Sequence, residues 1–168
     1  MAEMENVVEV TIEVPRGEQN KYEFDESTGK IKLDRVLFSP MFYPCDYGHI
    51  ENTLALDGDP LDVLVLTTNP TFPGCVIDTR IVGALIMSDD KGQDEKLIGV
   101  PLSDPRWENV HSLKDVNPHT LREIKHFFER YKELENKETT IIGWEGRDVA
   151  LKLIKSCQDR FKKYTVAE

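Results

Sequence analysis

The sequence lacks the long apolar run of a membrane segment, because no stretch approaches the roughly 20 apolar residues that span a bilayer. Its N-terminus, MAEMENVVEV, has neither the basic start nor the apolar centre of a secretory signal peptide. Cysteine is scarce, and the wide spacing of Cys45, Cys75 and Cys157 argues against a disulfide framework or a zinc site. We therefore expect a cytoplasmic protein with one domain over residues 1–168 and with the cysteines as reduced core side chains.

Positive charge is also in deficit, since 21 lysines and arginines face 31 aspartates and glutamates, for a net charge of −10. Nucleic-acid binding usually needs a basic face, so we predict no nucleic-acid partner and no membrane partner. The sequence has no P-loop, Rossmann glycine triplet, nucleophile elbow, CxxC pair or HExxH pair. A small anionic ligand stays compatible with this composition if metal ions carry positive charge between protein carboxylates and ligand oxygens.

What the sequence does have, over its first two-thirds, is the pattern of β-strands. Apolar and polar residues alternate over 8–14, and residues 21–25 and 31–38 flank turn residues 27–29 as in a hairpin. Further strands are expected at 61–67, 76–87 and 96–102. Short strands at this spacing favour a small β-barrel.

The last third changes to a helical period. Asn117 and Pro118 read as an N-cap followed by a proline in the first turn. The apolar residues that follow at helical spacing are Leu121, Ile124, Phe127, Phe128, Tyr131 and Leu134. A second helix, from about Asp148, carries Val149, Leu153, Ile154, Cys157 and Phe161. We predict a small β-barrel with two packed helices, in the α+β class.

The corner ALDGDPLD places three aspartates, Asp57, Asp59 and Asp62, within six positions. Gly58 and Pro60 bend the chain so that the three carboxylates can converge on a cation. The same residue types are ordinary in solvated turns, so the corner alone leaves both interpretations open. The spacing gives an EF-hand poor support, since the glycine and the bidentate glutamate do not fall where that loop needs them.

A second acidic segment, residues 88–95, lies between two predicted strands and precedes Lys96. Alone it is typical of a charged hairpin tip, but two such loops at one end of a barrel could face each other across a cleft. A ligand set made only of oxygen atoms suits Mg²⁺ or Mn²⁺. The four histidines, His49, His111, His119 and His126, are expected far from the aspartates, in surface or core positions.

Several cations and phenols could hold an anion. Lys21 and Glu23 share one face of a predicted strand, which alone indicates a surface ion pair. Arg35 has a planar fork that suits phosphate oxygens. Tyr43 and Tyr47 stand in a proline- and glycine-rich run, and Tyr131 and Lys132 end the first helix; packing and solvation are the simpler explanations for these four.

Taken together, these residues resemble a known family. The stretches EVP, KYE, DR, MFYPCDYG, DGDPLDVLV, a D-x4-D-x-K segment and FFERYK occur in the order and spacing of soluble inorganic pyrophosphatase, family I, Mg²⁺-dependent and of the prokaryotic type. The resemblance covers about residues 8 to 135, with His49 where an aromatic is common. It implies a closed or partly open five-stranded, OB-like β-barrel with additional strands and two C-terminal helices packed on it.

The resemblance also implies roles for individual residues. Asp57, Asp62 and Asp94 resemble ligands of two tightly bound Mg²⁺ ions, with Asp62 between them, and Asp59 resembles the residue that orients or deprotonates the attacking water. Ligands of further Mg²⁺ ions, partly through water, would be Asp89 and Glu13, with Glu23 in the same cluster. The groups that resemble phosphate ligands are Lys21, Arg35, Lys96, Tyr131 and Lys132, with Tyr47 near the leaving phosphate and Tyr43 in support.

The implied reaction is hydrolysis of inorganic pyrophosphate to two orthophosphates by direct attack of a water or hydroxide that bridges two Mg²⁺ ions, with Mn²⁺ or another divalent ion as the alternative cofactor. The resemblance further implies a homo-oligomer, a hexamer. Two rival functions use the same residues. A metal-binding module would leave the phosphate-binding cations without a role, and a barrel that binds single-stranded nucleic acid conflicts with the acidic composition.

Overall fold

The computed structural model describes residues 6–167. The strands are β1 (Val7–Val14), β2 (Asn20–Asp25), β3 (Lys30–Val36), β4 (Asp46–Ile50), β5 (Leu61–Val65), β6 (Val76–Asp89), β7 (Gly92–Pro101) and β8 (Thr140–Gly146). The helices are α1 (Pro118–Arg130) and α2 (Arg147–Val166), with short 3₁₀ turns η2 (Pro105–Trp107), η3 (Leu113–Asp115) and η4 (Glu133–Glu135). No helix within the described residues is both long and apolar enough to cross a membrane.

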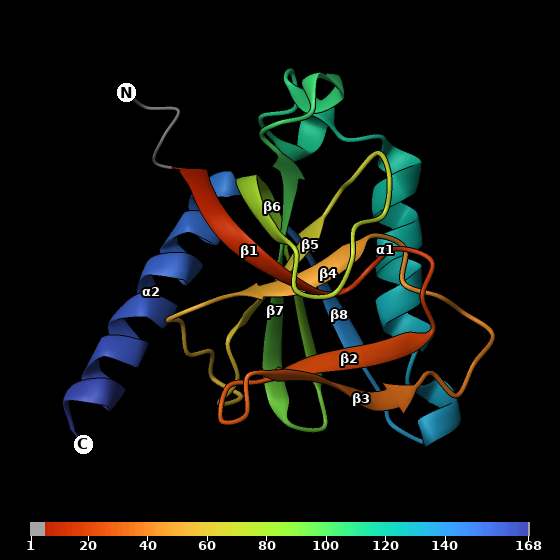
Figure 1. Ribbon diagram of the computed structural model, residues 1–168. Coiled ribbons are helices and arrows are strands. Elements are labelled where there is room, and N and C mark those ends of the chain that lie inside the picture. Colours follow the sequence, from red (N-terminus) through yellow and green to blue (C-terminus); the bar gives the residue numbers. More distant parts are fainter. Residues whose placement is uncertain (1–5, 168) are drawn as a thin grey trace.

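Five strands close into a ring. The main sheet has the order β1-β4-β5-β7-β6-β8, and β1 also pairs with β6, so β8 extends the sheet outside the closure. The β5–β7 pair is parallel, and the other pairs are antiparallel. Strands β2 and β3 form a separate hairpin below the ring, and α1 and α2 stand on opposite sides of it (Figure 1). The predicted α+β class, five-strand closure and two C-terminal helices are confirmed.

Two hydrophobic clusters hold the helices against the strands. One joins Phe127 and Phe128 of α1 to Leu85 of β6 and Ile98 of β7. The other joins Ile154 and Cys157 of α2 to inward residues of β1, β5, β6 and β7. Strand β1 alternates as its sequence predicts, with Val10, Ile12 and Val14 fully buried. Because β5 and β7 are apolar on both faces, each can contribute to both clusters.

The helices begin where the sequence predicts. The side chain of Asn117 caps α1 by accepting a hydrogen bond from the His119 N–H at 2.9 Å. However, α1 ends at Arg130, and Leu134, predicted on its apolar stripe, lies in η4 and is 60 % exposed. In α2, Ile154 and Cys157 are buried as expected. Val149, however, is exposed, and Ala150 is the buried residue at the start of this helix.

Two strands were not predicted, and glycine explains why. β4 has Gly48 at its centre, in a run rich in proline and glycine, and β8 contains Gly143 and is mostly exposed. Glycine normally weakens a strand, yet Gly48 is required here, because a Cβ would lie 2.0 Å from the carbonyl oxygen of Thr11. Its absence of a side chain therefore lets β4 pair closely with β1.

The predicted acidic loop over 88–95 is wrong in its extent. β6 continues to Asp89 and β7 starts at Gly92, so only Asp90 and Lys91 form the turn. Asp89 pairs with Gly92, and Asp94 pairs with Met87. The pairing of β6 with β7 extends through this polar segment, so Asp89 and Asp94 lie on strands and not in a loop.

A buried carboxylate fixes the loops at the other end of the ring. Asp46 is fully buried and accepts hydrogen bonds from the backbone N–H of Arg16 at 2.9 Å and of Thr71 at 3.0 Å. The hydroxyl groups of Thr71 and Thr67 donate to it as well, at 2.5 and 3.3 Å. Cys45 beside it and Cys157 are buried free thiols, as predicted, while Cys75 is only half-buried.

Candidate functional site

The acidic corner lies between β4 and β5 and combines a turn with the start of a strand. Gly58 has a φ of 91°, which glycine adopts without strain, and the N–H of Asp59 donates to Asp57 Oδ1 at 3.0 Å. Asp62 is the second residue of β5 and pairs in register with His49 on β4 and Lys96 on β7. The turn therefore holds Asp57 and Asp59, whereas the sheet holds Asp62.

Lys96 lies at the centre of the charged groups. It is 2 % exposed, and its Nζ donates to Asp62 Oδ2 at 2.9 Å and to the Tyr47 hydroxyl at 3.0 Å. Asp94 Oδ2 lies 3.1 Å from the same nitrogen. Burial alone would lower the pKa of Lys96, but the charges of Asp62 and Asp94 outweigh it and raise the pKa well above its usual value. Lys96 is a fixed positive charge inside the protein.

Three predicted metal-site or catalytic carboxylates have raised pKa values. Burial is the main cause of the raised pKa of Asp57, Asp59 and Asp94, and the negative charge of Asp62 adds to it in each case. Lysine charges act in the opposite direction without cancelling the shift. A divalent cation beside these oxygens would remove the electrostatic cost, so the donor set has the chemistry that Mg²⁺ prefers.

The carboxylates do not form a ready-made cage. Across residues 6–167, no three or more histidine, cysteine, aspartate or glutamate side chains are arranged to hold a metal ion as they stand. Instead, the amine of Lys96 lies between Asp62 and Asp94 and offsets part of their negative charge. The predicted convergence of these carboxylates on a cation would thus need side-chain rearrangements around Lys96.

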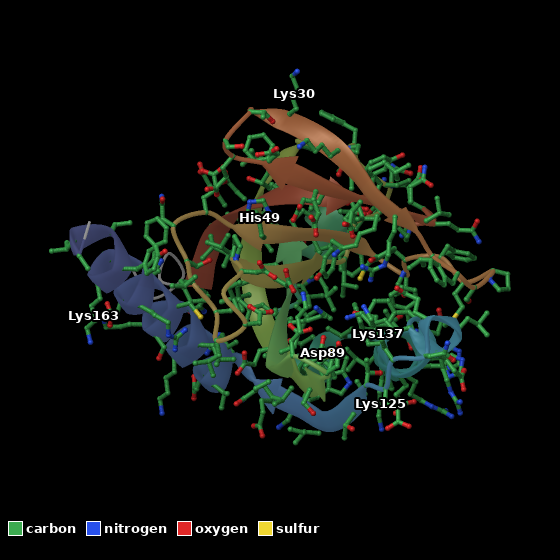
Figure 2. The ribbon with its side chains drawn as sticks, turned by 90° about the horizontal axis from the view of Figure 1, so that it is seen from below. Lys30, His49, Asp89, Lys125, Lys137 and Lys163 are labelled. Atoms are coloured by element: carbon green, nitrogen blue, oxygen red, sulfur yellow. The ribbon has the colours of Figure 1, made fainter. Side chains whose placement is uncertain are left out.

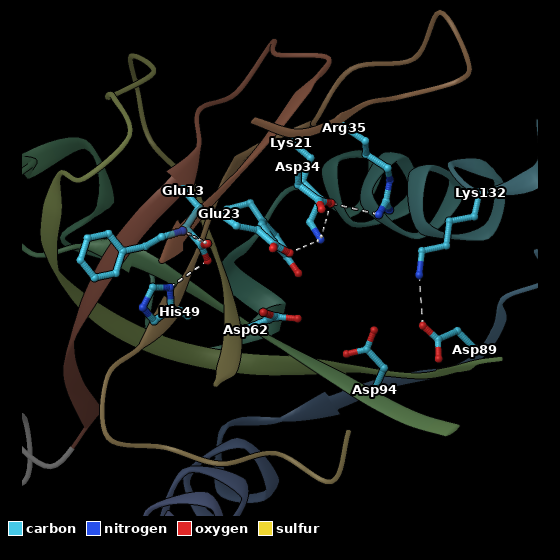
Figure 3. Close-up of polar contacts among 12 residues, drawn as sticks. Glu13, Lys21, Glu23, Asp34, Arg35, His49, Asp62, Asp89, Asp94 and Lys132 are labelled. Carbon is cyan, nitrogen blue, oxygen red and sulfur yellow. Dashed lines mark hydrogen bonds and ion pairs between the residues drawn. The ribbon is translucent and has the colours of Figure 1, made fainter. Parts of the chain in front are cut away.

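Glu13 reaches the site from a bulge in β1. Ile12 pairs with Gly48 and Val14 with Tyr47, so Glu13 is the extra residue between them. Its Oε1 lies 2.8 Å from His49 Nδ1, and its Oε2 accepts a hydrogen bond from the Phe24 N–H at 3.1 Å. The carboxylate is thereby held between the ring and the β2–β3 hairpin (Figure 3).

The expectation that all histidines lie far from the aspartates is wrong for His49. This residue is 5 % exposed, pairs with Asp62 in the sheet and lies in the interior of the molecule (Figure 2). Burial would lower its pKa, but the hydrogen bond and charge of Glu13 raise it. Alternation in DYGHI could have located it, because residues two apart on a strand share a face, and Tyr47 was a predicted site residue.

The β2–β3 hairpin contributes Lys21, Glu23 and Arg35. Lys21 Nζ donates to Glu23 Oε1 at 3.0 Å, as their shared face predicts. Asp34, which the DR stretch contains but to which no role was assigned, is the bulged residue opposite Lys21 and Tyr22. Its Oδ2 lies 3.6 Å from Lys21 Nζ and 3.3 Å from an Arg35 terminal nitrogen, so it joins the two cations (Figure 3).

A second pair closes the opposite side of the site. Lys132 Nζ donates to Asp89 Oδ2 at 3.2 Å, and both side chains are largely buried (Figure 3). Burial would raise the pKa of Asp89, but hydrogen bonds from Lys132 and the Lys91 N–H lower it. Tyr131 is 5 % exposed and packs against Phe127 and Phe128, with its ring 5.4 Å from Lys132 Nζ.

A cleft of about 320 Å³ opens between the hairpin, the acidic corner and the end of α2. The predicted site residues that line it are Glu13, Lys21, Glu23, Tyr47, Asp59 and Asp62. The others, outside its lining, are Arg35, Asp57, Asp89, Asp94, Lys96, Tyr131 and Lys132. The ion pairs of Lys96 connect the two groups through Asp62 and Asp94. Alternating cations and carboxylates of this kind can bind a phosphate compound together with divalent cations.

Comparisons with known proteins agree with this chemistry. Residues 10–162 match the family model described as inorganic pyrophosphatase. The chain is 60 % identical over 163 residues to an inorganic pyrophosphatase of Geobacillus stearothermophilus, covering 97 % of this chain and 99 % of the relative. It is 56 % identical over 155 residues to one of Methanosarcina acetivorans, covering 92 % of each. The crystal structure of inorganic pyrophosphatase from Thermus thermophilus superposes with a TM-score of 0.91 at 50 % identity, covering 94 % of this chain and 92 % of that one.

Proposed function

The chain belongs to the inorganic pyrophosphatase family, and from that premise we propose that it hydrolyses inorganic pyrophosphate to two orthophosphate ions with Mg²⁺ as cofactor. The observation that supports this most directly is the central Lys96, which is buried and bonded to Asp62, Asp94 and Tyr47. The positive charge of Lys96 can bind the negative oxygens of pyrophosphate, and the neighbouring carboxylates can bind the metal ions that accompany this substrate.

Asp57, Asp62 and Asp94 would hold two Mg²⁺ ions, with Asp62 shared between them. Glu13, Glu23 and Asp89 would take part in binding further ions that accompany the substrate. When bound, Mg²⁺ supplies neutralisation of the phosphate oxygens and lowers the pKa of a water molecule toward neutrality.

Asp59 is the residue that acts on the attacking water. It lines the cleft, and its carboxylate is free of the ion pairs that engage Asp62 and Asp94 within the described part of the chain. Its raised pKa makes it a better proton acceptor than an ordinary aspartate. Asp59 would orient the water for attack on phosphorus and accept a proton from it.

The cationic and phenolic groups would hold the two phosphates. Lys21 and Arg35 reach the substrate from the hairpin, Lys96 from the ring, and Tyr131 and Lys132 from the end of α1. Burial raises the pKa of Tyr47 well above 10, so its phenol keeps its proton and can donate to the departing phosphate. Preorganised positive charge stabilises the negative charge that develops as the P–O bond breaks.

Phosphate release from pyrophosphate, measured with malachite green, tests this function. Activity with Mg²⁺ and its loss in a chelated sample are expected, and an inactive wild-type protein would refute the proposal. Asp59→Asn should lower kcat by about 10²- to 10⁴-fold, the usual contribution of a positioned acid or base. Asp78→Asn makes the same change at an exposed site and should leave kcat unchanged. Near-normal turnover in Asp59→Asn would remove its assigned role.

Assembly and location complete the proposal. We propose a homohexamer that acts in the cytoplasm, and the surface offers apolar area for such contacts, since Phe38, Phe42 and Phe72 are 61 %, 57 % and 64 % exposed. Light scattering coupled to size-exclusion chromatography measures the assembly directly. A mass near 19.3 kDa at micromolar concentration would show a monomer instead.

A further inference from the structure

The β2–β3 hairpin is attached to the ring by few backbone bonds, although it carries Lys21, Glu23 and Arg35. Its two strands pair only with each other, in a two-stranded sheet separate from the ring. The placement of these side chains relative to the ring therefore depends on contacts that the hairpin makes with other elements. One such contact is Glu13 with the Phe24 N–H, at one end of the hairpin.

The second contact joins Arg35 to the turn after α1. Glu135 Oε1 lies 3.4 Å from Arg35 Nε, where the end of β3 meets η4 (Figure 1). The Glu135 side chain is 7 % exposed. Within residues 6–167, neither Arg35 Nε nor Glu135 Oε2 makes a hydrogen bond, although both atoms are buried. A buried carboxylate without full compensation is costly, so this position of Glu135 needs a reason.

The turn reverses the usual preference for burial. Glu135 points inward while its neighbour Leu134 is 60 % exposed, and Glu133 pairs with Arg130 at the surface. Asn136 adopts the left-handed conformation, with φ 56° and ψ 35°, which ends η4 immediately after Glu135. A turn that buries a glutamate and exposes a leucine does not serve the hydrophobic core.

We propose that Glu135 is a positioning residue for Arg35, which fixes the guanidinium and docks the hairpin against the end of α1. The inference deepens the proposed function and rests on it, since it assigns a residue that acts on substrate only through Arg35. The guanidinium offers five N–H donors in a rigid fork. Glu135 faces its Nε edge, so the terminal nitrogens stay directed elsewhere, one of them toward Asp34 at 3.3 Å.

This arrangement links two parts of the phosphate-binding set. Glu135 lies three positions after Lys132, and Lys132 is bound to Asp89 on β6. Arg35 pairs with Lys21 across the hairpin. An ion pair between Arg35 and Glu135 therefore sets the distance between the hairpin cations and Lys132, which together would hold one pyrophosphate.

The test compares Glu135→Gln with Glu133→Gln, a matched change of the same charge in the same turn at a 60 % exposed site. Steady-state kinetics with Mg²⁺ and pyrophosphate give kcat and KM, and calorimetry with methylenediphosphonate gives binding without turnover. We expect Glu135→Gln to raise KM and weaken analogue binding about tenfold, with a smaller effect on kcat, because the buried ion pair that positions Arg35 loses its negative partner. Glu133→Gln should match the wild type in both measurements.

A double-mutant cycle with Arg35→Lys shows whether Glu135 acts through Arg35. Adding Glu135→Gln to Arg35→Lys should change KM by less than about twofold, because the guanidinium that Glu135 orients is already absent. A full tenfold loss in that background, or a KM for Glu135→Gln equal to that of Glu133→Gln, overturns the inference. If Glu135→Gln does not fold, Glu135→Asp is measured in the same way, and a wild-type KM overturns it. Wild-type inactivity would instead refute the proposed function.

Discussion

Replacement of Lys96 by methionine tests the electrostatic centre of the protein. Methionine keeps most of the side-chain volume and its contacts with the Tyr47 and Phe128 rings, but it removes the positive charge. Asp62 and Asp94 then lose the cation at 2.9 and 3.1 Å and are left facing each other. In metal-free buffer, the folded state should become markedly less stable.

The size of the loss follows from the distances. Two unit charges about 3 Å apart attract by roughly 5.5 kcal/mol at an effective dielectric of 20. Desolvation of the buried ammonium offsets part of this attraction, and removal of one partner of a buried ion pair typically costs about 3–5 kcal/mol. For a chain of this size, each kcal/mol lowers Tm by about 2–4 °C, so Lys96→Met should lower Tm by roughly 6–20 °C.

Thermal scans with EDTA and with Mg²⁺ provide the assay. Because a divalent cation can replace the lost charge, Mg²⁺ should raise the Tm of Lys96→Met by more than it raises that of the wild type. Lys125→Met is the control, since Lys125 forms an exposed i,i+4 pair with Glu129 that contributes less than about 1 kcal/mol. A Tm for Lys96→Met within 2 °C of the wild type (a threshold of about 1 kcal/mol) in EDTA would refute the reasoning.

Two further predictions concern carboxylates. The pKa values of Asp57, Asp59 and Asp94 are raised in the folded protein, so the stability that these groups contribute is present below about pH 4 and is lost as the pH rises through their folded pKa values. The increase in Tm caused by Mg²⁺ should therefore be larger at about pH 8 than at pH 5. An equal or smaller increase at the higher pH would contradict this prediction. Asp46→Ala should lower the free energy of unfolding in urea by about 3 kcal/mol, since it leaves several buried donors unpaired, while Asp46→Asn should lose less because its amide oxygen still accepts; equal losses would show that acceptor chemistry is not the cause.

Local patterns predicted the elements whose residues have a regular period. The alternation of β1, the turn residues of the β2–β3 hairpin and the Asn117 cap of α1 all lie where the sequence indicated. These signals act within a few residues, so they do not depend on the rest of the chain. The candidate site residues were identified from motif order and spacing, and their roles stay predictions.

Other features depended on distant neighbours. β4 was missed because Gly48 looks unfavourable in a strand until the backbone of β1 approaches it. The acidic hairpin was predicted as a loop because the pairing of Asp94 with Met87 cannot be read from the charge of residues 88–95. Glu135 carries no motif, and only its contact with Arg35 reveals it, whereas strand alternation from Tyr47 could have indicated His49.

The sequence by itself determined the strand and helix periods, the acidic composition and the candidate residues that we predict to bind metal ions and phosphate. Only the tertiary structure decided that Lys96 occupies the space between Asp62 and Asp94 and that the hairpin contacts Glu13 and Glu135. The physical reason is distance, because charges interact strongly only within a few ångströms. Asp62 and Lys96 have a sequence separation of 34, and the parallel pairing of β5 with β7 brings them together.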